Sequence, residues 1–574
     1  MARKVAIGVD KFNEIVENDY FYVDKTGFLK EWWENGDKVT LITRPRRFGK
    51  TLTMSMLEQF FSVNYSDRKE MFCRFRVWKD EKLRKLQGTY PVINLSFAGI
   101  KSGCFETARE NICQEIVRVY MQNQFLLDGD LLAPQEKDYF RRICDTMSDA
   151  VASVSLKRLA EYLSRYYGKN VIILLDEYDT PMQEAYLAGY WKEMVSFTRS
   201  LFQSTFKTNP YMERAVMTGI TRVSKESVFS DLNNLKVITV TSDKYATAFG
   251  FTEEEVFRAL EEYGLQSRKK DVKKWYDGFQ FGRCDHIYNP WSVINFLDER
   301  KVAAYWAHTS SNSLEEKLIR ENGTDVKMIL EDLLNGKTFQ AVIDEEMIYE
   351  QLDYDVDAIW SLFLASGYLK INKIEKNRRG VDEYTFSLTN LEARFSFDEI
   401  VKGWFNYKEL KYNKFTDALL SDNKKYMNEY LNLITRETFS SFDTGLRPSK
   451  FRQPENFYHG FVLGLIADLR EIYNITSNRE SGEGRYDVMM EPKDLELDDG
   501  IILEFKVQDD SEKSLEDTVD AALSQIVRKK YGTALEARGV PGDRIRMYGF
   551  AFRGKEVLVD GGRMESEWKF RLND

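Results

Sequence analysis

The stretch formed by residues 43–51, TRPRRFGKT, constrains the fold of this chain more than any other. An apolar, β-branched run at residues 39–42 precedes it and is typical of a buried strand. A helix is predicted to follow, because the next apolar residues have the spacing of an inner helical face: Leu52, Met56, Leu57, Phe60 and Phe61. A strand, a loop ending in Gly-Lys-Thr and a helix form the arrangement that a phosphate-binding loop needs.

The end of this loop supplies the expected contacts to a nucleotide. Gly49 lets the backbone approach phosphate oxygens, and the helix start offers unpaired N–H groups. Lys50 would reach the β- and γ-phosphates, and the Thr51 hydroxyl would bind Mg²⁺. The residues expected to bind the nucleotide here are Arg47, Phe48, Gly49, Lys50 and Thr51. The general pattern of a phosphate-binding loop has a glycine where this chain has Arg44. The alternative to a phosphate-binding loop is an ordinary strand–helix turn with a surface lysine.

A second stretch strengthens the nucleotide interpretation. Residues 171–175 are continuously apolar, as in a strand buried on both faces, and Asp176 and Glu177 follow them. Asp176 would hold Mg²⁺, and Glu177 would polarise the attacking water. Thr218 and Arg222 follow a later strand and could contact the γ-phosphate, although ordinary loop polar residues fit those positions equally well. Together with the Gly-Lys-Thr loop, this pattern predicts an ATPase with ATP and Mg²⁺ as cofactors.

Size and composition limit the other choices. A chain of 574 residues is too long for one core, so several domains are expected. The net charge of −10 gives no global basic field, so nucleic acid would have to bind locally. Five cysteines without paired metal spacing fit a reduced, cytoplasmic protein. We expect no signal peptide and no membrane span, because no long apolar segment occurs.

The middle of the chain is predicted to be a helical lid followed by a winged-helix-like unit. Aromatic, turn-rich stretches at residues 275–279 and 288–292 would pack the lid. A helix at residues 359–365 precedes two strands, 368–374 and 384–388, joined by a charged loop. Such a helix and hairpin resemble a winged helix, which we interpret as structural here.

A second group of charged residues is predicted near the C-terminus. Glu504 and Lys506 project from one face of the strand at residues 501–507, and Asp487 lies on an earlier strand, 485–490. Asp487 and Glu504 would hold Mg²⁺ or Mn²⁺, which lowers the pKa of a bound water and stabilises charge on a phosphate. Lys506 would position that water or neutralise the transition state. The alternative is a cross-strand salt bridge at a sheet surface.

The elements around this group are in the order of the PD-(D/E)XK nuclease fold. A helix opening near Glu455 precedes the hairpin, and a helix predicted at residues 512–531 follows the Glu-x-Lys strand. In that fold Glu455 would be a further acid of the metal site, and Gln525 would contact substrate or water.

Several motifs make the chain similar to the bacterial AAA-ATPase-like proteins that carry a C-terminal PD-(D/E)XK nuclease domain. These motifs lie at residues 21–26, 44–51, 175–179, 218–222, 229–235, 288–292, 458–460, 477–482 and 504–506. The resemblance implies an α/β protein: a P-loop ATPase core with a parallel sheet (1–245), a helical lid and winged-helix-like region (246–410), and linker helices with a mixed α/β nuclease-like domain (411–574).

The resemblance implies an ATP-binding and ATP-hydrolysing protein coupled to a metal-dependent nuclease. Its catalytic residues would be Glu177, Asp487, Glu504 and Lys506. DNA or RNA would be the partner, and a homo-oligomer is compatible with this interpretation. The alternative is a nucleotide-switched scaffold or sensor whose nuclease fold only binds nucleic acid or a protein partner. A third option is an ATPase module that serves a protein partner.

Overall fold

The computed structural model describes residues 2–222, 229, 232–306, 313–321, 324–334, 336–343, 349–353, 355–403, 413–438, 462, 465–481, 484–509, 512–554 and 556–563. The chain divides into two compact units. Unit 1 comprises Met1–Leu318 and Thr338–Ser396, and unit 2 comprises Ile319–Lys337 and Phe397–Asp574. The domain boundaries expected after residues 245 and 410 remain predictions. None of the described helices is both long enough and apolar enough to cross a membrane.

Unit 1 is built on a five-stranded sheet in which every neighbouring pair of strands is parallel, in the order β2-β3-β4-β1-β5. Its strands are β1 (Val39–Thr43), β2 (Val92–Ser96), β3 (Val171–Asp176), β4 (Met212–Gly219) and β5 (Leu235–Ile238). β1 and β3 are buried along their whole length, as their continuous apolar sequences predict. The parallel α/β architecture predicted for this region is therefore confirmed.

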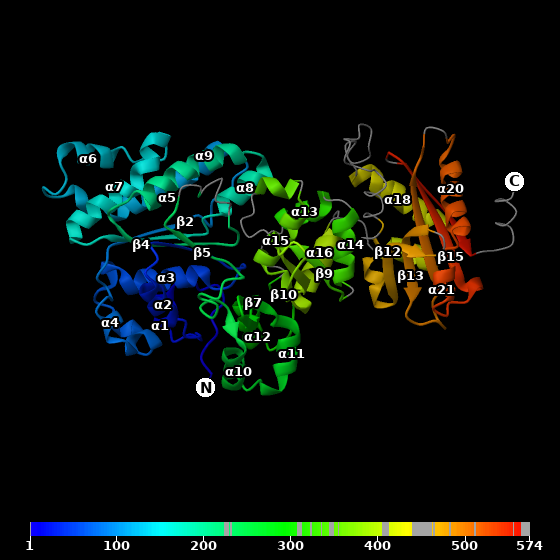
Figure 1. Cartoon of the computed structure of the whole chain (residues 1–574), viewed down its shortest axis with the longest axis horizontal. Helices are drawn as coiled ribbons and strands as arrows, with labels where there is room; N and C mark the ends of the chain where they lie inside the picture. Colours follow the sequence, from blue (N-terminus) through cyan, green and yellow to red (C-terminus); the bar gives the residue numbers. More distant parts are fainter. Residues whose placement is uncertain are drawn as a thin grey trace. The chain divides into compact units, whose positions relative to one another are not determined.

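Helices cover both faces of this sheet. Figure 1 shows α5, α7 and α9 on one side and α2 and α3 on the other. The predicted inner face of α3 is correct, because Met56, Leu57, Phe60 and Phe61 are buried against strand residues such as Leu174. The helices are α1 (Phe12–Glu17), α2 (Gly27–Asn35), α3 (Lys50–Phe61), α4 (Glu81–Arg84), α5 (Phe105–Gln122), α6 (Pro134–Arg141), α7 (Asp149–Tyr167), α8 (Thr180–Ala188) and α9 (Trp191–Phe202).

The lid is a small α/β layer with an aromatic core. Its short sheet has the order β6-β8-β7, formed by β6 (Phe251–Thr252), β7 (Phe279–Phe281) and β8 (Cys284–Tyr288). The helices are α10 (Glu253–Glu262), α11 (Lys269–Tyr276) and α12 (Pro290–Glu299). Thr252 and Glu255 form the predicted capping box of α10, and Asn289 caps α12 with Pro290 in its first turn. Buried aromatics such as Tyr276 and Phe296 fill the space between these helices.

The rest of unit 1 contains the predicted helix and hairpin. α15 (Val356–Ser366) precedes β10 (Leu369–Lys376) and β11 (Asp382–Leu388), which form an antiparallel sheet with β9 (Phe339–Val342) in the order β10-β11-β9. Trp360 of α15 contacts Phe339 of β9, so the helix packs on this sheet. α13 (Ser313–Glu321) and α16 (Leu391–Gly403) lie at the points where the chain passes between the units.

Unit 2 has a mixed five-stranded sheet in the order β12-β13-β14-β15-β16. Its strands are β12 (Tyr473–Ser481), β13 (Gly484–Pro492), β14 (Gly500–Val507), β15 (Ile545–Arg553) and β16 (Glu556–Arg563). Only β14 and β15 are parallel. The helices are α14 (Thr324–Leu334), α17 (Asn413–Leu420), α18 (Lys424–Thr438), α20 (Leu515–Arg528) and α21 (Thr533–Glu536).

The sheet of unit 2 is packed on both faces. Alternate residues of β14, such as Leu503 and Phe505, join one core with α17 and α18, and Ile502 joins a second core with α20. α20 approaches β15 closely at Gly549, where a Cβ atom would lie 2.9 Å from the Val519 carbonyl oxygen. Gly549 pairs with Glu504 of β14, so this close approach brings α20 next to the predicted acid.

Candidate nucleotide and nuclease sites

The predicted phosphate-binding loop connects β1, an interior strand of the unit 1 sheet, to α3. Gly49 has a φ of 80° immediately before the helix, and Arg47 has a φ of 67°. Both conformations lie in the left-handed region, which turns the backbone sharply at this point. The Lys50 ammonium is buried and donates hydrogen bonds to the carbonyl oxygens of Arg44 (3.0 Å) and Pro45 (2.9 Å). The loop therefore curls around the lysine, as a phosphate cradle requires.

Arg44, which replaces the first glycine of the general pattern, points away from this cradle. Its guanidinium donates to the carbonyl oxygens of Thr43 (2.9 Å) and Thr239 (2.6 Å) and lies 4.3 Å from the Phe281 ring centre. Burial lowers the pKa of Arg44 to about 9. The substituted position thus connects the loop to β5 and the lid and leaves the phosphate side of the loop open.

A cavity of about 440 Å³ lies beside the loop. The cavity is lined by residues 46–53, by residues 6–10 and 21–23, and by lid residues such as Trp291 and Ile294. The N-terminal segment therefore lies beside the loop. The Arg47 guanidinium lies 4.3 Å from the Trp291 ring centre, and the Phe48 ring packs on Phe279 at 4.8 Å. A lining that combines the loop with both polar and apolar side chains suits a phosphorylated ligand with an aromatic group.

Asp176 lies at the carboxyl end of β3 beneath the loop and is 2% exposed. The Thr218 hydroxyl donates to Asp176 Oδ1, whereas Oδ2 is buried without a hydrogen-bond partner among the described residues. Burial raises the pKa of the Asp176 carboxyl above its ordinary value, while the Thr218 and Thr51 hydroxyls stabilise its charged form. A buried carboxylate oxygen without a donor, next to a threonine hydroxyl, fits a Mg²⁺ ligand set.

Glu177 follows directly and lines the cavity. It has a φ of 50°, which is strained for a residue with a side chain, and its N–H donates to the Thr218 hydroxyl (3.4 Å). Burial lowers the pKa of the Lys50 ammonium, and the nearby carboxylates, Glu177 first and then Asp176, oppose that shift. The structure thus brings the loop lysine and both acids of β3 together, as the sequence predicts.

Asp179 is a residue of this site that sequence reasoning missed. Its buried Oδ2 accepts hydrogen bonds from the N–H groups of Ile220 (2.8 Å) and Thr221 (2.9 Å) and from the Thr221 hydroxyl (3.0 Å). A Cβ atom on Gly219 would lie 2.7 Å from Asp179 Oδ1, so the end of β4 approaches this carboxylate closely. Asp179 therefore fastens the turn that carries Glu177 to the end of β4. Asp179 ends the motif at residues 175–179, but the sequence alone gives it no role.

Thr218 and Arg222, the two residues that could contact a γ-phosphate, have different surroundings. Thr218 is buried and directs its hydroxyl to Asp176, and neither Thr218 nor Arg222 lines the cavity. Arg222 is half-buried, and residues 223–228 lie outside the described part of the chain. Contact between either residue and a γ-phosphate therefore remains a prediction.

In unit 2 the two predicted acids lie side by side on antiparallel strands. The Phe505 N–H donates to Asp487 Oδ2 (2.8 Å), and the Asp487 N–H donates to Glu504 Oε2 (3.3 Å). Glu504 is 2% exposed, and Phe505 points into the opposite core, as the strand alternation predicts. The two strands that carry the predicted acids are therefore neighbours in the sheet.

α20 and the turn after it complete this group. The Gln525 amide of α20 donates to Glu504 Oε1 and to the Tyr531 hydroxyl (3.4 Å). Sequence reasoning missed Tyr531, because an aromatic residue after a helix is more typical of a core. Burial raises the pKa of Tyr531, and the charges of Glu504 and Asp487 add to the shift. Lys506 is half-buried on the same strand face as Glu504.

These residues fit a hard divalent cation. Asp487 and Glu504 supply carboxylate oxygens, and Mg²⁺ is commonly held by one or two carboxylates together with water and substrate phosphate. The Gln525 amide and the backbone N–H groups orient both carboxylates, as residues around metal ligands do. Glu455, the further acid considered from the sequence, lies outside the described residues.

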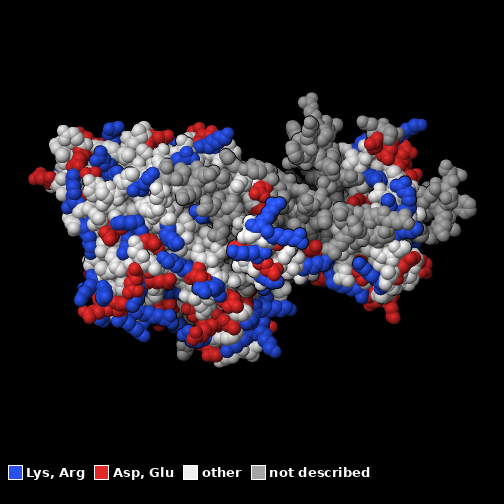
Figure 2. All heavy atoms as spheres, in the orientation of Figure 1, with Lys and Arg blue, Asp and Glu red and all other residues white. Residues whose placement is uncertain are grey.

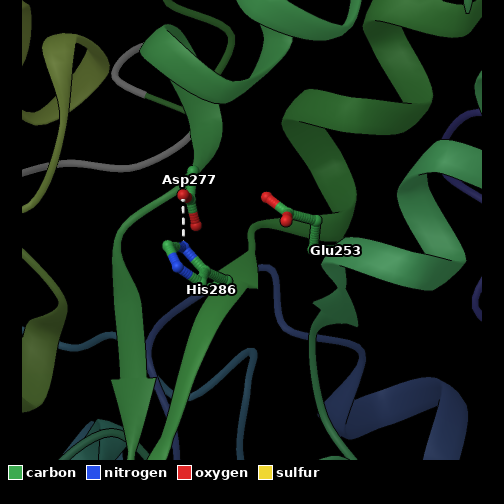
Figure 3. A group of neighbouring side chains, drawn as sticks. All are labelled: Glu253, Asp277 and His286. Carbon is green, nitrogen blue, oxygen red and sulfur yellow. Dashed lines mark hydrogen bonds and ion pairs between the residues drawn. The ribbon is translucent and has the colours of Figure 1, made fainter.

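A third acidic group lies in the lid and combines Glu253, Asp277 and His286 (Figure 3). The His286 Nδ1 lies 2.8 Å from Asp277 Oδ2, and the Gly278 N–H donates to Asp277 Oδ1 (2.7 Å). Glu253 accepts hydrogen bonds from the Lys273 ammonium (2.6 Å) and the Tyr288 hydroxyl (3.0 Å). Because the Lys273 ammonium pairs with Glu253 and lies 4.0 Å from Asp277, we interpret the group as an ion-pair network that joins α10, α11 and β8.

Comparisons with known proteins match the two regions of the chain that carry these candidate sites. Residues 6–229 match a family model described as a predicted AAA-ATPase. Residues 453–561 match a model of the PD-(D/E)XK nuclease superfamily. A protein of Azotobacter chroococcum mcd 1, named "Uncharacterized protein in vnfD 5'region", is 27% identical over 402 residues, which are 69% of this chain and 69% of that protein.

One solved structure, that of the Aeropyrum pernix ORC2 protein in its ADPNP-ADP complexes, is similar over 66% of this chain and 92% of that chain. Its sequence identity to this chain is 10% and its TM-score is 0.24. A TM-score this low does not support a common fold. The resemblance expected from the motifs is confirmed by the two family models. The chain thus joins an AAA-ATPase-like domain near its N-terminus to a C-terminal domain of the PD-(D/E)XK nuclease superfamily.

Proposed function

We propose that unit 1 binds and hydrolyses Mg-ATP and that unit 2 is a metal-dependent nuclease. The observation that carries the first part is the buried, unpartnered Oδ2 of Asp176 beside Thr51 and Lys50. An isolated buried carboxylate oxygen is costly, and a bound cation would compensate for that cost. The adjacent cavity has room for the rest of a nucleotide.

In this proposal each residue of the ATP site has one task. Lys50 binds the β- and γ-phosphates, and backbone N–H groups at the start of α3 cradle them. Thr51 and Asp176 hold Mg²⁺, which neutralises charge on the phosphates. Glu177 orients the attacking water from the cavity wall. Asp179 keeps Glu177 in place through the end of β4.

The nuclease part rests on the pairing of Asp487 with Glu504 and on the family match of residues 453–561. A divalent cation held by these carboxylates would activate water and stabilise charge on a phosphodiester. Lys506 lies on the same face as Glu504 and would bind the scissile phosphate or position the water. Figure 2 shows basic and acidic residues interspersed over the visible face, so we propose that nucleic acid is bound locally.

Calorimetry tests the ATP site. Lys50→Ala should weaken Mg-ATP binding about 10- to 100-fold, because a hydrogen bond to a charged group contributes about 1.5–3 kcal/mol. Glu177→Gln should keep the affinity and slow hydrolysis about 100-fold or more. Equal ATP affinity in wild type and Lys50→Ala would refute the assignment.

Cleavage assays test the nuclease site. Purified protein is incubated with labelled DNA or RNA and Mg²⁺ or Mn²⁺, with and without ATP. Asp487→Ala and Glu504→Ala should each abolish metal-dependent cleavage while ATP binding persists. Nucleic-acid binding without any cleavage in the wild type would favour the scaffold or sensor alternative instead.

A further inference from the structure

The hairpin formed by β10 and β11 extends out of the core of unit 1. Its base is anchored, because Leu369 and Phe386 are buried and Phe386 packs on Phe339. Exposure then increases along β10, and every residue from Asn372 to Lys376 is exposed. β10 is also an edge strand of its sheet, with β11 as its neighbour. The distal half of the hairpin therefore presents its side chains to solvent.

The turn at the tip of this hairpin has a defined conformation. Asn377 Oδ1 accepts hydrogen bonds from the N–H groups of Arg379 (2.9 Å) and Val381 (3.1 Å). The Asn377 N–H donates to the Val381 carbonyl oxygen (2.9 Å), and Gly380 has the positive φ, 77°, that the turn requires. The side chain of Asn377 thus fixes the turn and the direction in which its neighbours project.

Two arginines project from this turn. Arg378 and Arg379 are exposed, and the described residues contain no ion pair with either of them. Two lysines of the hairpin have an acidic residue nearby. Lys373 pairs with Glu375 at 2.7 Å, and Lys376 lies opposite Asp382 in the strand register. In a chain with a net charge of −10, adjacent arginines held on an ordered, exposed turn form a local positive site.

The chemistry of this site matches a phosphate backbone. Guanidinium groups bind phosphate oxygens bidentately and stay charged at any physiological pH. Exposed Ile374 and Val381 flank the turn and add apolar surface that could contact sugar or base. An acidic protein segment could also pair with arginines, but the proposed nuclease already requires nucleic acid as a substrate.

We propose that the β10–β11 tip, defined as residues 376–382, binds the phosphate backbone of the nucleic acid on which unit 2 acts, in addition to the structural role that the sequence predicts for this hairpin. This inference rests on the proposed nuclease function and adds a substrate contact that lies outside the nuclease unit. Arg378 and Arg379 would each neutralise one phosphate. Contacts to the backbone position a nucleic acid without reading its sequence, so the tip should increase affinity for all sequences alike.

Fluorescence anisotropy on the full-length chain tests the proposal. The parent protein carries Glu504→Ala so that no substrate is cleaved, and labelled DNA and RNA oligonucleotides are titrated at several salt concentrations. Adding Arg378→Ala and Arg379→Ala should weaken binding about tenfold at moderate salt. It should also reduce the slope of log K against log salt by about two, because each lost phosphate contact contributes about 0.9 for duplex DNA.

A matched control is the double substitution Lys373→Ala and Glu375→Ala, which removes an ion pair of the same hairpin without changing its net charge. It should leave affinity and salt slope unchanged. Restoring charge with Arg378→Lys and Arg379→Lys should recover most of the salt slope. Unfolding midpoints of all variants should match the parent, because the substituted residues are exposed.

Three outcomes overturn the inference. If the parent binds and the arginine variant binds equally well with the same slope, the tip has no role while the nuclease proposal stands. If the ion-pair control loses as much affinity as the arginine variant, the effect is not specific to the arginines. If the parent binds neither DNA nor RNA, the inference fails together with the proposed function.

Discussion

The hydroxyl of Tyr349 lies 2.9 Å from the hydroxyl of Thr221, in a buried contact between residues 128 positions apart in the chain. Thr221 in turn donates to Asp179, so three buried side chains connect the turn after β3 to the 3₁₀ helix Tyr349–Asp353. The Tyr349 ring also lies between Trp191 and Tyr186, at 5.2 and 5.5 Å. Tyr349 lies beyond the residues that match the ATPase family model.

Asp179 should act as a positioning residue for ATP hydrolysis. Asp179→Ala leaves two N–H groups and one hydroxyl near the end of β4 without their acceptor, which releases the turn that carries Glu177. We expect kcat for ATP hydrolysis to fall about tenfold or more, while the Kd for ATP changes about threefold or less. Steady-state kinetics and calorimetry on the same preparation separate the two quantities.

Tyr349→Phe is the matched control for Asp179→Ala. It removes one hydroxyl on the other side of Thr221 and should cost about 1 kcal/mol of stability. Thr221 can still donate to Asp179, so kcat should stay close to wild type. A fall in ATP affinity as large as the fall in kcat for Asp179→Ala would show that Asp179 acts on binding rather than on positioning.

Arg44 should support stability rather than ATP affinity. Arg44→Ala leaves the carbonyl oxygens of Thr43 and Thr239 without their donor and removes the contact with Phe281, at a cost of about 2–4 kcal/mol. Arg44→Met keeps most of the volume and removes a buried charge, so it should cost less. Both variants should bind ATP with a Kd within about threefold of wild type, because Arg44 does not line the cavity.

Chemical denaturation measures the first effect, and calorimetry below the unfolding transition measures the second. Loss of ATP binding in Arg44→Met protein that remains folded by circular dichroism would show that Arg44 contacts the nucleotide or shapes its cradle directly.

Gln525 should tune the metal affinity of the nuclease site. Its amide holds the Glu504 carboxylate, so Gln525→Ala should raise the Mg²⁺ concentration for half-maximal cleavage about 10- to 100-fold. The rate at saturating Mg²⁺ should fall much less, because the carboxylates themselves remain. A metal titration of the cleavage rate checks this, with Gln508→Ala as a matched control, because Gln508 lies just after β14 and its amide donates to the Glu512 carbonyl oxygen rather than to an acid of the site. An unchanged half-maximal concentration would contradict this role.

Glu392 should make unit 1 less stable as the pH rises. Burial raises the pKa of its carboxyl to about 7, although the Ser292 hydroxyl (2.7 Å) and the Trp306 N–H (2.7 Å) both donate to it. Because the folded pKa exceeds the ordinary value of 4.5, the folded state binds the proton more tightly between these pH values. Stability should therefore fall across this window, by up to about 3 kcal/mol.

Glu392→Gln removes this dependence, because the amide oxygen can accept from the Trp306 N–H while the amide NH2 group donates to the Ser292 hydroxyl, without a charge. The variant should be more stable than wild type at about pH 8 and show little advantage at about pH 5. Unfolding midpoints at the two pH values check this. A constant difference between the two proteins across the window would show that Glu392 does not titrate there.

The elements that the sequence predicts well are those with a local signal. The apolar strand before the Gly-Lys-Thr loop, the apolar strand that ends at Asp176 and the Glu-x-Lys strand each carry their pattern within a few residues, so these strands and their acids could be placed. The sequence also places Asp487 and Glu504 in one predicted metal site, and the antiparallel pairing of β13 with β14 brings the two residues together.

The residues that sequence reasoning missed depend on contacts between distant segments. Asp179 has its function only because the end of β4, about forty residues later, bends back onto it. The direction of the Arg44 side chain could not be predicted either, because the guanidinium packs on Phe281, whose position depends on the fold of the lid. Tyr531 has no local pattern that distinguishes it from an ordinary core tyrosine. Hydrophobic periodicity predicts which face of a helix or strand is buried, but not which residues of other segments that face contacts.

The path of the chain through its two units determines how the protein can be dissected. The backbone passes from one unit to the other after residues 318, 337 and 396. α14 belongs to unit 2 and contacts β12, although it precedes β9 of unit 1 in the sequence. A fragment that begins after residue 396 therefore lacks part of unit 2, and one protease cut there would leave α14 covalently attached to unit 1. Separate expression of the two units would need internal deletions, joining residue 318 to 338 in unit 1 and residue 337 to 397 in unit 2, rather than a simple truncation.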